Sequence, residues 1–136
     1  VTLTLPKISR RTHATGELRS VVIPDEQDLD YLPLVIGKMV LLGPPRIRAV
    51  QRGRKFVALE GSHRICAAKV LTYPVLVQLV RDDYCCPRSI QLSLVNWNVR
   101  KAGLAADILL RDYERGGASS LVRVKVVLCD AHWRVL

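Results

Sequence analysis

The run at residues 75–80 (Val-Leu-Val-Gln-Leu-Val) limits the possible folds of this chain more than any other feature. Gln78 is its one polar side chain, and Pro74 stands immediately before it. A strand that packs on one face alternates apolar with polar side chains, whereas a strand covered on both faces does not. We therefore expect residues 75–80 to form a strand buried on both faces, which requires other elements on each side of a sheet.

Three further strands are predicted upstream of this run. Residues 19–23 are rich in β-branched side chains and are followed by Pro24, which favours a short strand ending there. Residues 46–50 and 55–59 are two apolar stretches separated by a polar segment that contains Gly53. Glycine supplies the backbone dihedrals that tight turns need, so these two stretches are predicted to form a β-hairpin.

Two helices are predicted among these strands. Asp25 or Asp28 can cap the first helix, and Gly43 followed by two prolines ends it. Its apolar side chains recur at helical spacing: Leu29, Leu32, Ile36, Met39 and Val40. The second helix is expected over residues 63–71. This order of elements predicts an α/β (α+β) domain, a small mixed sheet with flanking helices, whose core is complete by about Val80.

The 136 residues are divided by composition into three segments. Residues 1–17 are polar and irregular and are predicted to be a flexible lead-in. Residues 18–84 are predicted to form the core, and residues 85–136 a C-terminal extension that packs on it. Within the extension we expect a helix with an alanine-rich face at 102–113 and a final half-exposed strand at 122–126.

The formal net charge of +9 suits a polyanionic partner, either nucleic acid or the phosphates of a small ligand. The charges are also unevenly distributed. Between Tyr31 and Leu59 every charged side chain is basic, while acidic residues concentrate just before this stretch. The basic residues are Lys38, Arg46, Arg48, Arg52, Arg54 and Lys55. For any one of these side chains, ordinary solvated surface charge is the alternative interpretation.

Several classes of protein and site are not expected. No run of 18 apolar residues occurs, so we predict no transmembrane helix and no membrane partner. The first residues lack the layout of a signal peptide, and a cytoplasmic protein is expected. The four cysteines show no C-x-x-C spacing, so reduced packing thiols are predicted rather than a metal site. The sequence does not indicate an oligomeric state.

The segment around Gly61 combines several features that attract anions. A strand is predicted to run into this glycine and straight into a helix, whose first amide groups lack internal partners and whose dipole is positive at that end. Gly61 allows close backbone approach, and Ser62 can cap the helix or donate to a phosphate. His63 and Arg64 add further donors, and Arg48 on the hairpin extends the basic surface. We predict a phosphate site here, the alternative being an ordinary turn and helix cap.

Residues 59–68 (Leu-Glu-Gly-Ser-His-Arg-Ile-Cys-Ala-Ala) resemble the signature of the ParB/sulfiredoxin superfamily. In that superfamily a strand leads into Gly-x-[His/Glu]-Arg and then into a helix that opens with small residues. Residues 42–50 and 74–77 are similar to the flanking stretches, so the resemblance covers residues 20–81. It implies that the turn binds nucleotide phosphates, and ATP, ADP or CTP with Mg²⁺ is the expected ligand.

Two branches of the superfamily differ in their catalytic residues. Sulfiredoxins carry a catalytic cysteine where this chain has Ser62, so their activity is not expected here. Free-serine kinases have an acidic residue where Glu60 stands and a catalytic glutamate near the position of Glu26. Resemblance to that branch implies that Glu26 acts as a general base and that Glu60 positions a metal-bound water or a hydroxyl. For Glu26, charge complementarity at a helix N-terminus is the alternative.

The third branch is the ParB partition clamp, which binds CTP and DNA. Residues 96–100 (Asn-Trp-Asn-Val-Arg) match its later helix motif in part. The sequence therefore predicts a nucleotide- or phosphate-binding domain, and nucleotide hydrolysis or phosphoryl transfer is the class of reaction if the domain is an enzyme. The alternatives are a DNA-binding module that acts through its basic surface without small-molecule chemistry, and an interaction domain that has lost its ligands.

Overall fold

The computed structural model of the chain describes residues 16–24, 31–92 and 97–136. Its elements are β1 (Glu17–Ile23), α2 (Leu32–Leu42), β2 (Arg46–Arg52), β3 (Lys55–Ala58), α3 (Ser62–Leu71), β4 (Val75–Leu79), β5 (Cys85–Leu92), β6 (Trp97–Lys101), α4 (Ala102–Glu114) and β7 (Ser120–Cys129). Helices and a mixed sheet make this an α+β fold, as predicted. Among these helices, none has the length and apolar character that crossing a membrane requires.

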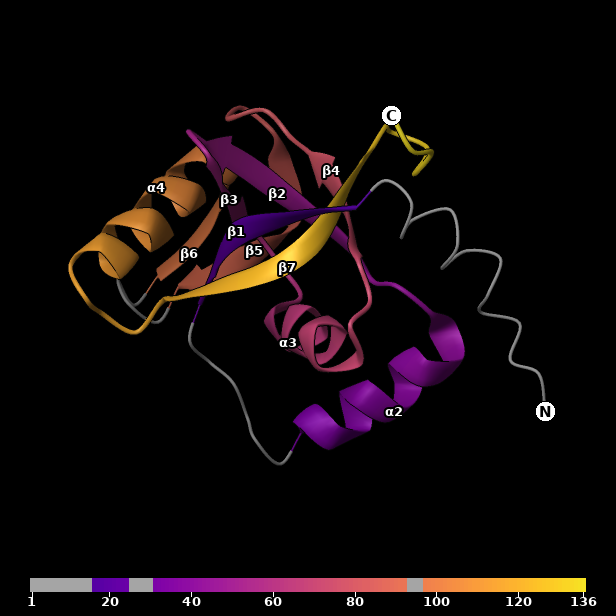
Figure 1. Cartoon of the computed structure of the whole chain (residues 1–136). Helices are drawn as coiled ribbons and strands as arrows, with labels where there is room; N and C mark the ends of the chain where they lie inside the picture. The colour runs from indigo at the N-terminus through magenta and orange to yellow at the C-terminus, as the bar shows by residue number, and fades with distance from the viewer. Residues whose placement is uncertain (1–15, 25–30, 93–96) are drawn as a thin grey trace.

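Five strands close into a barrel in the order β1-β3-β2-β4-β7 (Figure 1). The β2–β3 hairpin is antiparallel, as the glycine-containing turn predicted. The β1–β7 pair is also antiparallel. The pairs β1–β3, β2–β4 and β4–β7 are parallel. In Figure 1, α2 and α3 lie below the barrel, and α4 lies to its left with the two-stranded sheet of β5 and β6.

The barrel wall is covered on both faces in its central part. Because successive side chains of a strand point to opposite faces, Val21 and Ile23 of β1 pack inside the barrel, while Val22 packs outside with α4. In β4, Val75 and Val77 join the interior cluster, and Leu76 packs outside beside Val127. The prediction that this apolar strand is buried on both faces is confirmed for these three residues.

The core does not end near Val80, and that part of the prediction is wrong. The final strand β7 lies between β1 and β4 and pairs with both, so the barrel closes only with residues 120–129. Its alternation was predicted correctly: Val122, Val124 and Val126 are buried. Alternation shows that one face of a strand is buried, but it does not show which other strands this strand pairs with.

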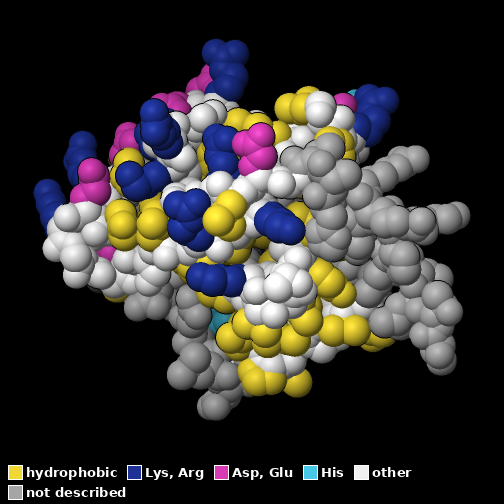
Figure 2. Space-filling model, in the orientation of Figure 1, with side chains coloured by type: hydrophobic (Ala, Val, Ile, Leu, Met, Phe, Trp, Pro, Cys, Tyr) yellow, Lys and Arg dark blue, Asp and Glu magenta, His cyan; other side chains and the backbone are white. Residues whose placement is uncertain are grey.

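The two helices below the barrel pack against each other and against its open end. Helix α2 has a proline in its first turn and ends at Gly43, where φ is +84°, as predicted. The predicted caps Asp25 and Asp28 lie outside the described residues. Met39 is buried as expected, but Leu34, Leu41 and Leu42 of α2 are exposed, and hydrophobic side chains show in the lower part of Figure 2. Helix α2 is therefore apolar on both sides.

Candidate functional site

The path from β3 into α3 is fixed by two backbone features. The amide of Leu59 donates to the carbonyl of Arg48 at 3.1 Å, which continues the hairpin past the end of β3. Gly61 then takes the cap position of α3 with φ +76°, and its carbonyl accepts the first helical hydrogen bond, from Ile65, at 2.9 Å. Ser62 is therefore the first helical residue rather than the cap. Within the described residues no side chain caps α3, so its first turn offers amide donors at the positive end of the helix dipole.

Gly61 is required here by both conformation and space. Its positive φ lies in the left-handed region that favours glycine. A Cβ atom would also collide with Cδ1 of the buried Ile47 and lie 2.9 Å from Nη2 of Arg64. The missing side chain thus lets the Arg64 guanidinium lie directly against the backbone of the turn.

Among the described residues, Arg64 is held at the turn by one side-chain hydrogen bond. Its Nη1 donates to the carbonyl of Arg46 at 3.2 Å, at the start of β2. Within the described parts of the chain, Arg64 forms no ion pair with a carboxylate, since none lies within 4.0 Å of its nitrogens. The guanidinium is therefore positioned by the fold while its positive charge is available to a ligand.

A cavity of about 400 Å³ opens at this end of α3. Gly61, Ser62, His63 and Arg64 form one side, and Pro24, Tyr31 and Val35 complete the lining. The ring of Tyr31 meets the His63 imidazole edge-on, with the ring centroids 5.2 Å apart and the planes at 85°. No carboxylate is among these lining residues, so the cavity presents donors and one cation beside apolar surface. This combination suits an oxyanion with an organic part attached.

The structure brings together four of the predicted site residues and separates two others from them. Gly61, Ser62, His63 and Arg64 all line the cavity, but Glu60 and Arg48 do not. Glu60 is exposed, and its carboxylate lies 3.9 Å from the guanidinium of Arg48. The backbone turns sharply at Gly61, and this directs the side chains on either side of it to different surfaces.

Arg48 belongs instead to a network that supports the C-terminal turn. Its Nε donates to the side-chain oxygen of Gln78 at 3.1 Å, and Gln78 donates in turn to the carbonyl of Asp130 at 3.0 Å. The guanidinium carbon of Arg48 also lies 5.7 Å from the ring of Trp133. The backbone amide of Arg134, and then that of His132, lowers the pKa of the Asp130 carboxyl. These contacts give Arg48 a structural role in this turn.

Glu26, the predicted general base, lies outside the described residues. Pro24 and Tyr31, the described residues on either side of it in the sequence, both line the cavity. The sequence did not predict the wall of the cavity that Pro24 and Tyr31 form. It arises because β1 and β3 are parallel, which puts their carboxyl ends at the same edge of the sheet. A pattern that revealed the parallel pairing would have placed Pro24 beside Gly61.

The described residues that line the cavity do not suit a divalent cation on their own. Magnesium prefers carboxylate and water oxygens, and the described lining residues offer two hydroxyls, an imidazole and a guanidinium. Within the described ranges no group of three or more His, Cys, Asp or Glu side chains could hold a metal ion. The residues present fit a phosphate group but not Mg²⁺ itself.

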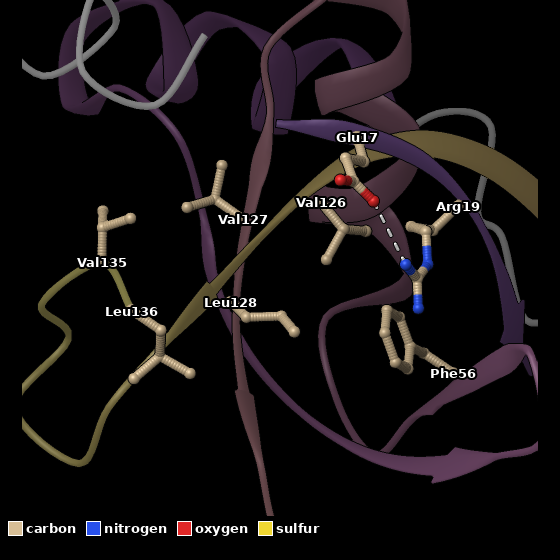
Figure 3. Close-up of a pocket in the computed structure, with 8 residues that line it drawn as sticks. All are labelled: Glu17, Arg19, Phe56, Val126, Val127, Leu128, Val135 and Leu136. Carbon is tan, nitrogen blue, oxygen red and sulfur yellow. Dashed lines mark hydrogen bonds and ion pairs between the residues drawn. The ribbon is translucent and has the colours of Figure 1, made fainter. Parts of the chain in front are cut away.

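A second cavity, of about 200 Å³, lies where the C-terminal residues pass the barrel (Figure 3). Phe56 and the aliphatic side chains of β7 and the C-terminus supply its apolar surface. Its charged residues, Glu17 and Arg19, form an ion pair with atoms 3.3 Å apart, drawn as the dashed line in Figure 3. Because this pair is neutral overall, the cavity lacks the excess positive charge found beside α3.

Comparison with known proteins gave no match: no family model, curated protein or solved structure is similar to this chain. The resemblance to the ParB/sulfiredoxin superfamily therefore remains a prediction from residues 20–81.

Proposed function

We propose that this domain binds the phosphate group of a nucleotide or of another phosphorylated small molecule in the cavity at the start of α3. The observation that carries this proposal is that a helix N-terminus capped by no described side chain meets the guanidinium of Arg64 in one cavity. Helix N-termini bind anions through free amides and the helix dipole, and a guanidinium adds charge-assisted hydrogen bonds.

The contacts divide between the phosphate and the rest of the ligand. The amides of the first turn and Arg64 would bind phosphate oxygens, and the Ser62 hydroxyl can donate another hydrogen bond. Tyr31 and Val35 offer apolar surface on the other side, suited to a base or sugar. A volume of about 400 Å³ is in the range of cavities that hold small organic ligands.

The geometry supports binding more directly than catalysis. Glu60 does not line the cavity, so it is not positioned to act on a phosphate bound there. Catalytic roles for Glu26 and Glu60, and a requirement for Mg²⁺, stay predictions from the family resemblance. Phosphoryl transfer needs an activated acceptor as well as a bound phosphate.

Thermal unfolding with a panel of ATP, ADP, CTP and GTP, each with and without Mg²⁺, tests the proposal. A ligand that binds only the folded state at a concentration of 100 times its Kd adds about 2.7 kcal/mol of stability. We expect at least one nucleotide to raise the Tm by several degrees. The Arg64→Ala variant should lose this shift, because the guanidinium is the one cation among the described lining residues.

Arg111→Ala is the matched control, since Arg111 is an exposed arginine on α4, which does not line the cavity. This variant should keep the full shift. Arg64→Ala should also fold, because within the described part of the chain the arginine side chain donates one hydrogen bond, to a backbone carbonyl. A shift that survives in Arg64→Ala would show that the ligand binds elsewhere, and no shift with any nucleotide would rule out tight binding of this class.

A further inference from the structure

The outer face of the β1–β7 pair carries basic side chains next to one another. Val122, Val124 and Val126 of β7 point into the core, so Arg123 and Lys125 between them point outwards and are exposed. In the register with β1, Arg123 stands opposite Ser20 and Lys125 opposite Leu18. Side chains directly opposite each other share a face, so the outward face of β1 here is uncharged.

A groove of about 160 Å³ runs between this face and the C-terminal part of α3. Lys69 of α3 faces Arg123 and Lys125 across it. The remaining lining residues are neutral: Leu18, Ala68, Thr72, Tyr73 and Val124. The groove therefore has three cations at its margins and apolar surface between them, and no carboxylate among the residues that line it.

No described carboxylate neutralises the charges of these three cations. Over the described ranges, no ion pair within 4.0 Å involves Lys69, Arg123 or Lys125, whereas the carboxylates of the same fold pair mainly with other arginines. In Figure 2, Lys and Arg side chains lie across the middle of the molecule, where Figure 1 places β1 and β7. Like charges gathered without counter-charges repel one another, and a polyanion would relieve this repulsion.

We propose that this groove binds the phosphodiester backbone of a nucleic acid. Alternate residues of a strand are about 6.8 Å apart, so Arg123 and Lys125 can contact successive phosphates of one strand. The net charge of +9 favours such a partner over an acidic small molecule. With seven aromatic residues in the chain, recognition through the backbone fits better than base stacking.

The groove is distinct from the cavity proposed to bind a nucleotide. Lys69 lies in the last turn of α3, whereas Gly61 caps its first turn. A ten-residue helix is about 15 Å long, so the two sites lie at opposite ends of α3. This inference therefore does not depend on the proposed function, and each can fail while the other holds.

Binding of a fluorescent mixed-sequence duplex DNA, measured by anisotropy over a series of salt concentrations, tests the groove. If each of the three cations neutralises one phosphate, the logarithm of the association constant should fall with the logarithm of salt with a slope of about −2.7. The Arg123→Gln/Lys125→Gln double variant should weaken binding at least tenfold and reduce the slope by about 1.8, at about 0.9 for each contact removed.

Lys69→Gln is a second variant on another element and should reduce the slope by about 0.9. Arg111→Gln, which removes an exposed arginine of α4, is the control and should leave DNA binding within about twofold. The nucleotide-induced shift in Tm should persist in the groove variants, and Arg64→Ala should retain most DNA binding.

Two results would overturn the proposal. One is DNA binding that is absent, or that the groove variants leave unchanged in affinity and salt slope. The other is equal or tighter binding of poly-glutamate with the same loss in the variants, since this would identify an acidic protein segment as the partner.

Discussion

At the scale of single residues, the site depends on Gly61. Its φ of +76° lets the chain turn sharply from β3 into α3, and its lack of a side chain lets Arg64 lie against the turn. Gly53 and Gly116 meet only the first of these demands. Gly53 in the hairpin has φ +62°, but a Cβ atom there would meet nothing within 4 Å.

We expect Gly61→Ala to lower the free energy of unfolding by about 2–4 kcal/mol, from left-handed backbone strain together with overpacking. The added methyl group must displace either Ile47, which is buried, or the guanidinium of Arg64. Denaturation by urea measures the loss. Gly53→Ala has a similar backbone conformation without the contact and should cost only about 1–2 kcal/mol. Equal losses for the two variants would contradict the close packing described for Gly61.

At the scale of elements, Arg52 connects the end of β2 to the segment after β4 and to α4. From the end of β2 it forms two hydrogen bonds of 3.0 Å to the carboxylate of Asp82, which follows β4. Its Nε donates to Asp107 of α4 at 2.8 Å. The hydrogen bonds that Arg52 donates to Asp82, and then to Asp107, raise the pKa of this guanidinium above its usual value. Arg52 thus fixes α4 against the barrel.

Replacing Arg52 by methionine keeps most of the aliphatic side chain and removes these bonds. We expect a loss of about 1–2 kcal/mol in the free energy of unfolding, because the geometry is bidentate and the arginine is partly buried. Arg81→Met is the control: its pair with Asp83 is longer, 3.8 Å, and both side chains are largely exposed. That change should cost less than about 0.5 kcal/mol. A similar cost for both would show that the Arg52 network adds no stability.

Local patterns predicted the barrel strands and the helices well and their pairing partners poorly. They missed β6 at Trp97–Lys101, because the partial match of residues 96–100 to a helix motif was wrong for the described residues. The hairpin turn at Gly53, the end of α2 at Gly43 and the apolar strand β4 each follow from neighbouring residues, so they could be predicted from the sequence. The position of β7 between β1 and β4 depends on residues far apart in the chain. No short pattern carries that information.

The same distinction holds for the candidate site. Gly61, Ser62, His63 and Arg64 are consecutive in the sequence, and their place at the start of a helix could be predicted from the turn. The opposite wall of the cavity comes from the end of β1 and the start of α2. The separation of Arg48 from the cavity could not be predicted either, because its partner Gln78 belongs to another strand.

At the scale of the whole molecule, α3 lies between two positively charged surfaces. Its first turn opens into the cavity that holds Arg64, and its last turn borders the groove with Arg123 and Lys125. The helix packs against α2 and β7, so it links the two surfaces through the core. The nucleotide and the nucleic acid that we propose as ligands would therefore not overlap, and binding of one would leave the site of the other open.

The most direct test of the central claim is a titration of the isotope-labelled protein with the nucleotide that gives the largest shift in Tm, followed by nitrogen–proton correlation spectra. Amides that donate to a bound phosphate shift strongly on binding. We expect the largest changes at Ser62, His63 and Arg64, saturating together with the same Kd and absent in Arg64→Ala. If the nucleotide saturates the protein while the signals of these three amides do not shift, the start of α3 is not the phosphate-binding site.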